Sequence, residues 1–208
     1  MLPPEILIPF IVASALLSIA PGPDNLYVLT QSALSGAKNG LIITLGLCTG
    51  LIVHTTLVAI GVAALIQASP TAFTLLKIIG ALYLLYLAWQ ILSSPAARLS
   101  GGKTQSLTPF QLYRRGILMN ISNPKILVFF LAFLPQFALP QNGPLMPQLF
   151  QLGALFIVVG FIIFSVIAFL SGRLGDWLKH SPRAQLYLHR IAGAVFIALA
   201  INLLAAQV

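Results

Sequence analysis

The stretch Pro21-Gly22-Pro23-Asp24-Asn25 interrupts a first segment that otherwise suits a membrane helix. Residues 6–20 before it are almost entirely hydrophobic, and residues 26–34 after it are again compatible with a helix. Two prolines around a glycine cannot continue an α-helix, because proline lacks the N–H and its ring clashes with the preceding turn. In hydrocarbon, the freed backbone groups survive only inside protein or along a water-filled cavity. The stretch therefore predicts a broken helix, and the carboxylate within it marks a candidate site.

The composition places the chain in a membrane. Of its 208 residues, 59% are hydrophobic and only 7% are charged, whereas a soluble domain carries about 25% charged residues. At about 20 residues per crossing, the length suits six transmembrane helices and leaves no room for a separate soluble domain. We therefore expect an all-α integral membrane protein that forms one domain over residues 1–208.

The net charge of +8 follows the pattern of membrane topology and does not indicate a nucleic-acid partner. Basic residues gather in the connections after the first, third and fifth predicted crossings, whereas the other connections and the C-terminus hold essentially none. Because Lys and Arg in short loops stay in the cytoplasm, both termini are predicted to face away from it. The residues behind this prediction are Lys38, Arg98, Lys103, Arg114, Arg115, Arg173, Lys179 and Arg183.

Six hydrophobic segments divide into two similar halves. They cover about residues 4–34, 41–67, 71–92, 112–137, 148–171 and 186–206. The fourth segment carries a second proline-centred break, Asn123-Pro124-Lys125. A duplicated half with three crossings must be inverted relative to its partner, and inverted repeats with interrupted helices in matching positions are typical of transporters with a midplane site. We predict one repeat over about residues 1–95, a basic cytoplasmic connector over about 96–111, and a second repeat over about 112–208.

Three motifs carry a family resemblance. Pro21-Gly22-Pro23-Asp24 is similar to a PGPD/PGPN motif, and the runs NISNPK at 120–125 and FFLAFLPQF at 129–137 match a second motif in the fourth segment. The run GALYLLYL at 80–87, preceded by Lys77, matches a third helix. In their order along the chain, and over its whole length, the motifs resemble those of the LysE/RhtB family of bacterial amino-acid exporters.

The resemblance implies a secondary transporter that exports an amino acid or a close derivative across the bacterial inner membrane, driven by a proton or ion gradient. Both predicted termini would then be periplasmic. The expected partners are an amino-acid substrate, protons or a counter-ion, and the lipid bilayer. No cofactor or enzymatic activity is expected, the ATP-binding GxxxxGK[ST] motif is missing, and a homodimer is left open.

Asp24 and Lys125 are the leading candidates for binding substrate or protons. Asp24 is the one acid inside a predicted crossing, and Lys125 is the one base near the middle of a crossing. We expect both to face a central cavity, where they either pair directly or divide a zwitterion between them. The structural alternatives are that Asp24 caps the resumed half-helix, and that Lys125 snorkels or bonds carbonyls freed by Pro124.

Further candidates surround these two. Asn25 and Asn123 can offer donors and acceptors either to a ligand or to unwound backbone. His54 is a candidate for a proton path with Asp24, although a buried histidine bonded across helices is the commoner case. The predicted hinge of the two breaks consists of Pro21, Gly22, Pro23 and Pro124.

Three other classes of membrane protein are alternatives to an exporter. A thiol-redox conduit needs a cysteine pair, and Cys48 is alone. An intramembrane metalloprotease needs a signature such as HExxH, which the chain lacks. A divalent metal or other cation exporter on the same scaffold is the alternative function, although Asp24, His54 and Cys48 form a thin set of ligands and no metal site is predicted.

Overall fold

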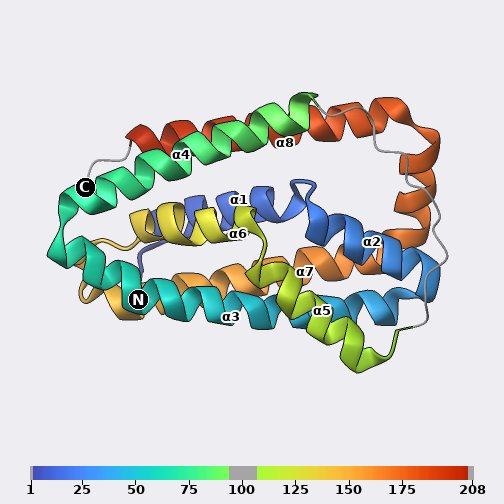
Figure 1. Ribbon diagram of the computed structural model, residues 1–208, viewed down its shortest axis with the longest axis horizontal. Helices are drawn as coiled ribbons and strands as arrows, with labels where there is room; N and C mark the ends of the chain where they lie inside the picture. The colour runs from blue at the N-terminus through green and yellow to red at the C-terminus, as the bar shows by residue number, and fades with distance from the viewer. Residues whose placement is uncertain (1, 94–106, 206–208) are drawn as a thin grey trace.

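The computed structural model describes residues 2–93 and 107–205, and every regular element in these two ranges is helical. Two half-helices come first and are followed by two long helices, by a second broken region, and by two more long helices (Figure 1). The α-helices are α1 (Pro4–Ile19), α2 (Pro23–Ser35), α3 (Ala37–Ala68), α4 (Pro70–Ser93), α5 (Pro109–Ile121), α6 (Pro124–Val128), α7 (Leu145–His180) and α8 (Pro182–Ala205). A π-helix (Phe129–Phe133) and a 3-10 turn (Leu134–Phe137) extend α6, and a further 3-10 turn covers Pro140–Asn142.

The described helices provide four to six candidate membrane crossings. Helices α3, α4, α7 and α8 are each long and apolar enough to cross alone. Helices α1 and α2 form a bent pair with an angle of 60°, and α5 forms a second bent pair with Pro124–Phe137, at 50°. Counting each bent pair as one span gives six. The prediction of an all-α, multi-span membrane protein with proline breaks in its first and fourth helices is therefore confirmed.

The prediction of a charged loop after the fifth crossing is wrong. Helix α7 continues to His180, and only Ser181 separates it from α8. The apolar span within α7 ends at Gly172. Polar residues are compatible with a loop, but equally with a helix that continues beyond the membrane, so composition alone could not tell the two apart.

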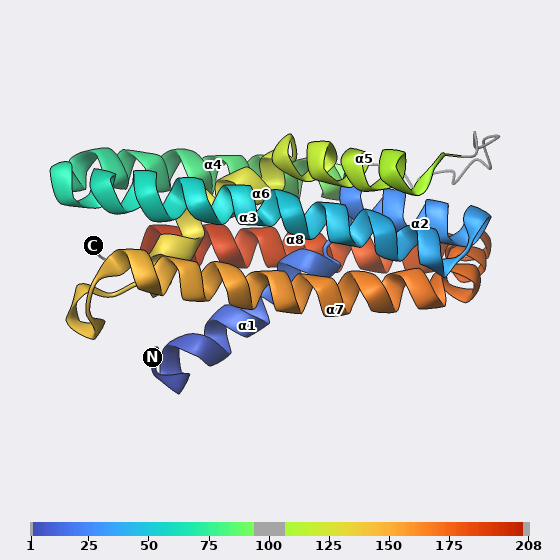
Figure 2. The ribbon, with the colours of Figure 1, turned by 90° about the horizontal axis from the view of Figure 1, so that it is seen from below.

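The helix contacts made by the first half have counterparts in the second half. The first bent pair packs on α7, and the second packs through α5 on α3. Helix α3 packs on α7, and α4 packs on α8 along most of its length (Figures 1 and 2). Such counterparts are what a twofold relation between inverted halves would produce. The repeat boundaries stay a prediction, and most of the predicted connector (94–106) lies outside the described residues.

The chain starts and finishes at the same end of the molecule. In Figure 1 the beginning of α1 and the end of α8 lie together, while the end of α4 and the beginning of α5 lie towards the opposite end. If each bent pair is one span, six crossings would give this arrangement. The α2–α3 and α7–α8 connections lie towards that same opposite end (Figure 1).

Small residues let α3 and α5 cross at close range. A Cβ atom on Gly46 would lie 2.2 Å from the carbonyl oxygen of Tyr113, and one on Gly116 would lie 2.4 Å from the carbonyl oxygen of Ile43. A Cβ atom on Gly50 would meet the Asn120 side chain at 2.7 Å. The absence of side chains at Gly46, Gly50 and Gly116 therefore allows α3 and α5 to approach each other closely.

Aromatic side chains fill the half of the molecule on the side of the termini. Phe10, Phe129, Phe130, Phe133 and Phe156 are fully buried. Ring centroids lie 4.9 Å apart for Phe129 and Phe133, 5.1 Å for Phe129 and Phe156, and 5.2 Å for Phe130 and Phe156. Three of these rings come from the π-helix, whose wider turn is a feature often found at functional sites. We call these five residues the phenylalanine cluster.

Candidate functional site: two helix breaks that meet

The first break follows directly from its prolines. Helix α1 ends at Ile19, and Ala20 turns out of the helix with φ −54° and ψ 121°. In a continuous helix the Leu17 carbonyl would accept from residue 21, but Pro21 has no N–H. Helix α2 restarts at Pro23, in the first helical position where proline is well tolerated. Asp24 is the acidic residue of its first turn, and no side chain caps this N-terminus.

The second break has the same order of residues with a different cap. Helix α5 ends at Ile121, and α6 restarts at Pro124. Asn123 caps α6, because its side-chain oxygen accepts from the Lys125 backbone N–H at 3.0 Å. Asp24 and Lys125 thus occupy equivalent places, each directly after the proline that begins a half-helix.

The two breaks are joined by side-chain hydrogen bonds. Asn123 donates from Nδ2 to Asp24 Oδ2 at 2.8 Å. The Lys125 ammonium donates to the carbonyl oxygens of Leu17 at 3.2 Å and Ala20 at 3.1 Å. Asp24 and Lys125 are 1% and 5% exposed. The carbonyls that Lys125 satisfies belong to the end of α1, so they are freed by Pro21 and not by Pro124.

Asp24 and Lys125 share a central cavity without pairing directly. Each lines a cavity of about 10 Å³, together with Ser18, Cys48 and Asn120. Among the described residues, the side-chain hydrogen bonds of these two charged groups run to Asn123 and to carbonyls at the end of α1, and no ion pair joins the two groups. The expected common cavity is therefore present, and Asn123 bridges the gap between the two breaks.

His54 and Asn25 lie beside this centre. His54 Nε2 lies 3.2 Å from the Asn120 carbonyl oxygen at the end of α5, and its ring lies 5.7 Å from that of Phe130. It does not line the cavity that holds Asp24. Asn25 donates from Nδ2 to the Ser18 carbonyl oxygen at 2.6 Å, which satisfies backbone near the end of α1. Both contacts match the structural alternatives that the sequence left open.

A larger cleft lies between the two breaks and helices α4 and α8. Its volume is about 600 Å³, within the range of about 300–1,000 Å³ that is usual for small-molecule sites. One wall consists of Gly22, Pro23, Asn123 and Lys125, and the facing wall comes from α4 and α8. The facing residues include Tyr83, Tyr86, Gln90, His189 and Phe196. Lys125 thus lies between the cleft and the central cavity, whereas Asp24 lines only the cavity.

The sequence reasoning did not assign the α4 residues to a site. Tyr83, Tyr86 and Gln90 recur at helical spacing on one face, which was the available signal. The ring centroids of Tyr83 and Tyr86 lie 5.9 Å apart, and Tyr86 is 48% exposed. Tyrosines on a membrane helix usually mark its interface with water, so their place against the breaks became apparent only from the packing of α4.

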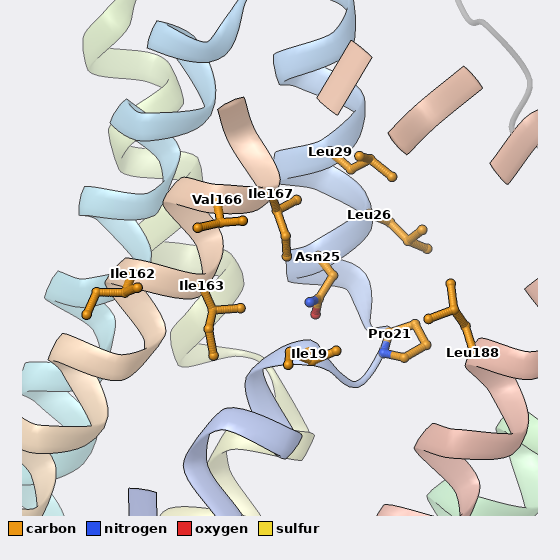
Figure 3. Close-up of a pocket in the computed structure, with 10 residues that line it drawn as sticks. All are labelled: Ile19, Pro21, Asn25, Leu26, Leu29, Ile162, Ile163, Val166, Ile167 and Leu188. Carbon is orange, nitrogen blue, oxygen red and sulfur yellow. The ribbon is translucent and has the colours of Figure 1, made fainter. Parts of the chain in front are cut away.

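A third space lies on the opposite face of α2. It has a volume of about 350 Å³ and is lined by aliphatic side chains of α2 and α7, by Ile19 and Leu188, and by a single amide, Asn25 (Figure 3). Ile162 and Val166 are half exposed, so this space borders the lipid-facing surface. In Figure 3 the Asn25 amide points into it between Ile163 and Pro21.

The described residues offer no ligand set for a metal. They contain no group of three or more His, Cys, Asp or Glu side chains that could hold an ion. Metal carriers need several such ligands to converge. The alternative function of divalent-metal export therefore gains no support from the site.

Comparison with known proteins agrees with this architecture. Residues 15–207 match the family model described as LysE type translocator. The chain is 34% identical over 188 residues to the homoserine/homoserine lactone efflux protein of Salmonella typhimurium, covering 90% of each chain. It is 31% identical over 188 residues to an uncharacterized membrane protein of Vibrio cholerae, covering 90% of this chain and 91% of that one. It is 26% identical over 202 residues to the leucine efflux protein of Salmonella choleraesuis, covering 95% of this chain and 94% of the relative.

A multi-span helical protein with two meeting helix breaks has an architecture that is typical of membrane transporters. The chain belongs to the LysE type translocator family. No solved structure matches it.

Proposed function

We propose that the protein is a secondary active exporter of a neutral amino acid or a close derivative across the bacterial inner membrane. The observation that carries the proposal is the meeting of the two breaks, with Asp24, Asn123 and Lys125 in one bonded group. Buried ionisable groups inside a membrane protein mark substrate or ion paths. The efflux relatives point to the same activity.

The α-ammonium group is the recognition element that we propose. The names of two relatives include homoserine, homoserine lactone and leucine. The lactone has no free carboxylate, whereas all three carry an amino group. A substrate in the cleft would place its ammonium near the Tyr83–Tyr86 pair, because aromatic faces attract cations. Its carboxylate, where one is present, would meet Lys125.

Transport would proceed by alternating access around the breaks. The cleft of about 600 Å³ reaches Lys125 from the side where α4 ends and α8 begins. Towards the termini, the phenylalanine cluster closes the path with fully buried rings. Opening on that side would require the π-helix and α1 to separate while the cleft closes. The proline breaks would serve as the hinge.

Asp24 would couple export to the proton gradient. It is buried behind Asn123 and Lys125, and a carboxylate in a low-dielectric place resists ionisation. Rearrangement of the bond between Asn123 and Asp24 would expose it to one side at a time. We place both termini in the periplasm, because the basic connections share the opposite end.

The test is uptake into inside-out proteoliposomes, where export appears as accumulation. Radiolabelled leucine, homoserine, homoserine lactone, threonine and lysine would be offered with an imposed proton gradient and again after addition of an uncoupler. Accumulation of a neutral amino acid that the uncoupler abolishes supports the proposal. Transport of none of the panel, or transport that the uncoupler leaves unchanged, would contradict it.

A further inference from the structure

Two buried oxygen atoms at the centre of the molecule have no hydrogen-bond partner among the described residues. They are Oδ1 of Asp24 and Oδ1 of Asn120, whose side chains are 1% and 2% exposed. A buried acceptor without a donor costs about 1–3 kcal/mol. Two such atoms in one place therefore point to a partner that is not a protein side chain.

Both residues line the same small cavity. Its volume of about 10 Å³ corresponds to room for about one water molecule. Ser18 also lines it and adds a hydroxyl group. A buried water typically makes about three hydrogen bonds. A water here would donate to the two Oδ1 atoms and accept from the Ser18 hydroxyl, which uses all three groups.

The amide of Asn120 is held in this position by the helix crossing. A Cβ atom on Gly50 would lie 2.7 Å from Asn120 Cβ and 2.7 Å from its Oδ1, so only glycine leaves room for the side chain. The Asn120 backbone carbonyl is in contact with His54 Nε2 at 3.2 Å. Asn120 is thus fixed at the end of α5, where it faces the first break.

We propose that one buried water binds between Asp24 and Asn120, and that Asn120 is a positioning residue for Asp24. The water would join α2 to the end of α5, as Asn123 joins α2 to α6. A sodium ion fits the site less well, because the Lys125 side chain lines the same cavity with a positive charge. The role in transport rests on the proposed export function, whereas the water itself does not.

Two substitutions of Asn120 separate a water site from simple packing. Asn120→Leu keeps the branched shape and the number of side-chain heavy atoms but has no polar atom, whereas Asn120→Ala leaves room for a second water. If Asn120 acts through water, the maximal export rate falls about tenfold in Asn120→Leu and clearly less in Asn120→Ala. KM should stay within about twofold of the wild type in both, because Asn120 does not line the cleft.

The matched controls are Asn202→Leu and Asn202→Ala. Asn202 is an exposed amide on α8 and lines neither the cleft nor the central cavity. We expect both control variants to keep the wild-type rate. A packing role for Asn120 would reverse the order and leave the Leu variant more active than the Ala variant, which would overturn the proposal.

Two further measurements do not depend on transport. Thermal unfolding of the purified protein should give a lower midpoint for Asn120→Leu than for Asn120→Ala, and an experimental density map of the wild type should contain a water peak between Asp24 and Asn120. An absent peak overturns the proposal even if export is found. If sodium raises the wild-type midpoint but not that of the Asn120 variants, the site takes a cation and the proposed water is wrong. If amino acids are not exported, the map and the unfolding order still decide the question.

Discussion

Lys125 occupies the place in the second break that Asp24 occupies in the first. The two charged groups, however, interact with opposite ends of helices. Asp24 sits in the first turn of α2, where the helix dipole favours an anion. Lys125 sits in the first turn of α6, where a cation is disfavoured. Its ammonium instead reaches the carbonyls of Leu17 and Ala20 at the C-terminus of α1, where a positive charge is stabilising.

Lys125 therefore has a structural role and, in our proposal, a substrate role, and a substitution should affect both. Lys125→Met leaves two buried carbonyls without donors, which should lower the free energy of unfolding by about 1–3 kcal/mol. It should also remove any preference for a free amino acid over its carboxamide in competition assays. Thermal unfolding and inhibition of labelled leucine export measure the two effects.

Lys38 provides the matched control for this prediction. It is exposed near the start of α3 and has no place in the breaks. Lys38→Met should keep the wild-type stability and substrate preference. If Lys125→Met is as stable as Lys38→Met and still prefers the free acid, both roles given to Lys125 are wrong.

At the scale of elements, the crossing of α3 and α5 determines where the second break lies. Gly46→Ala would push a methyl group against the Tyr113 carbonyl, which is backbone and cannot turn aside. Overpacking of this kind costs about 1–3 kcal/mol. We expect a lower unfolding midpoint and slower export, because the crossing also positions His54 and Asn120 against each other.

Gly61 on the same helix is the control for the crossing. A Cβ atom there would meet nothing within 4 Å. Gly61→Ala should leave export unchanged and raise stability slightly, because alanine favours helix by up to about 1 kcal/mol over glycine. Equal unfolding midpoints for the two variants would mean that the close crossing does not exist.

The elements also differ in how much of them could be predicted from sequence. Prolines fix the ends of α1, α2 and α6 by removing N–H groups, so both breaks could be read directly. The partners of Lys125 could not, because its target carbonyls lie in another half-helix more than 100 residues away. Asn120 was quoted only as part of a family motif, since its orphaned oxygen is a property of packing. The end of α7 was missed because polarity does not distinguish a loop from an extended helix.

At the scale of the whole molecule, the arrangement of charge predicts orientation. Lys38 lies in the first turn of α3, beside the α2–α3 connection, while the turn at Pro140–Asn142 has no charge. Positive connections stay in the cytoplasm. In a Cys48→Ala background, Lys38→Cys should react with a membrane-impermeant maleimide only in inside-out vesicles, and Asn142→Cys only in intact spheroplasts. The reverse pattern would show that the predicted topology is inverted. The cleft would then open to the opposite side of the membrane.

If the meeting breaks form a proton-coupled export site, replacing Asp24 should abolish gradient-driven accumulation. The decisive measurement compares gradient-driven accumulation of the exported amino acid by the wild type, Asp24→Asn and Glu5→Gln in inside-out proteoliposomes. Glu5 is an exposed acid in the first turn of α1, so its amide variant controls for loss of a carboxylate. We expect wild-type accumulation for Glu5→Gln and at least a hundredfold loss, about 2.7 kcal/mol, for Asp24→Asn. Full gradient-driven accumulation by Asp24→Asn would contradict this proposal.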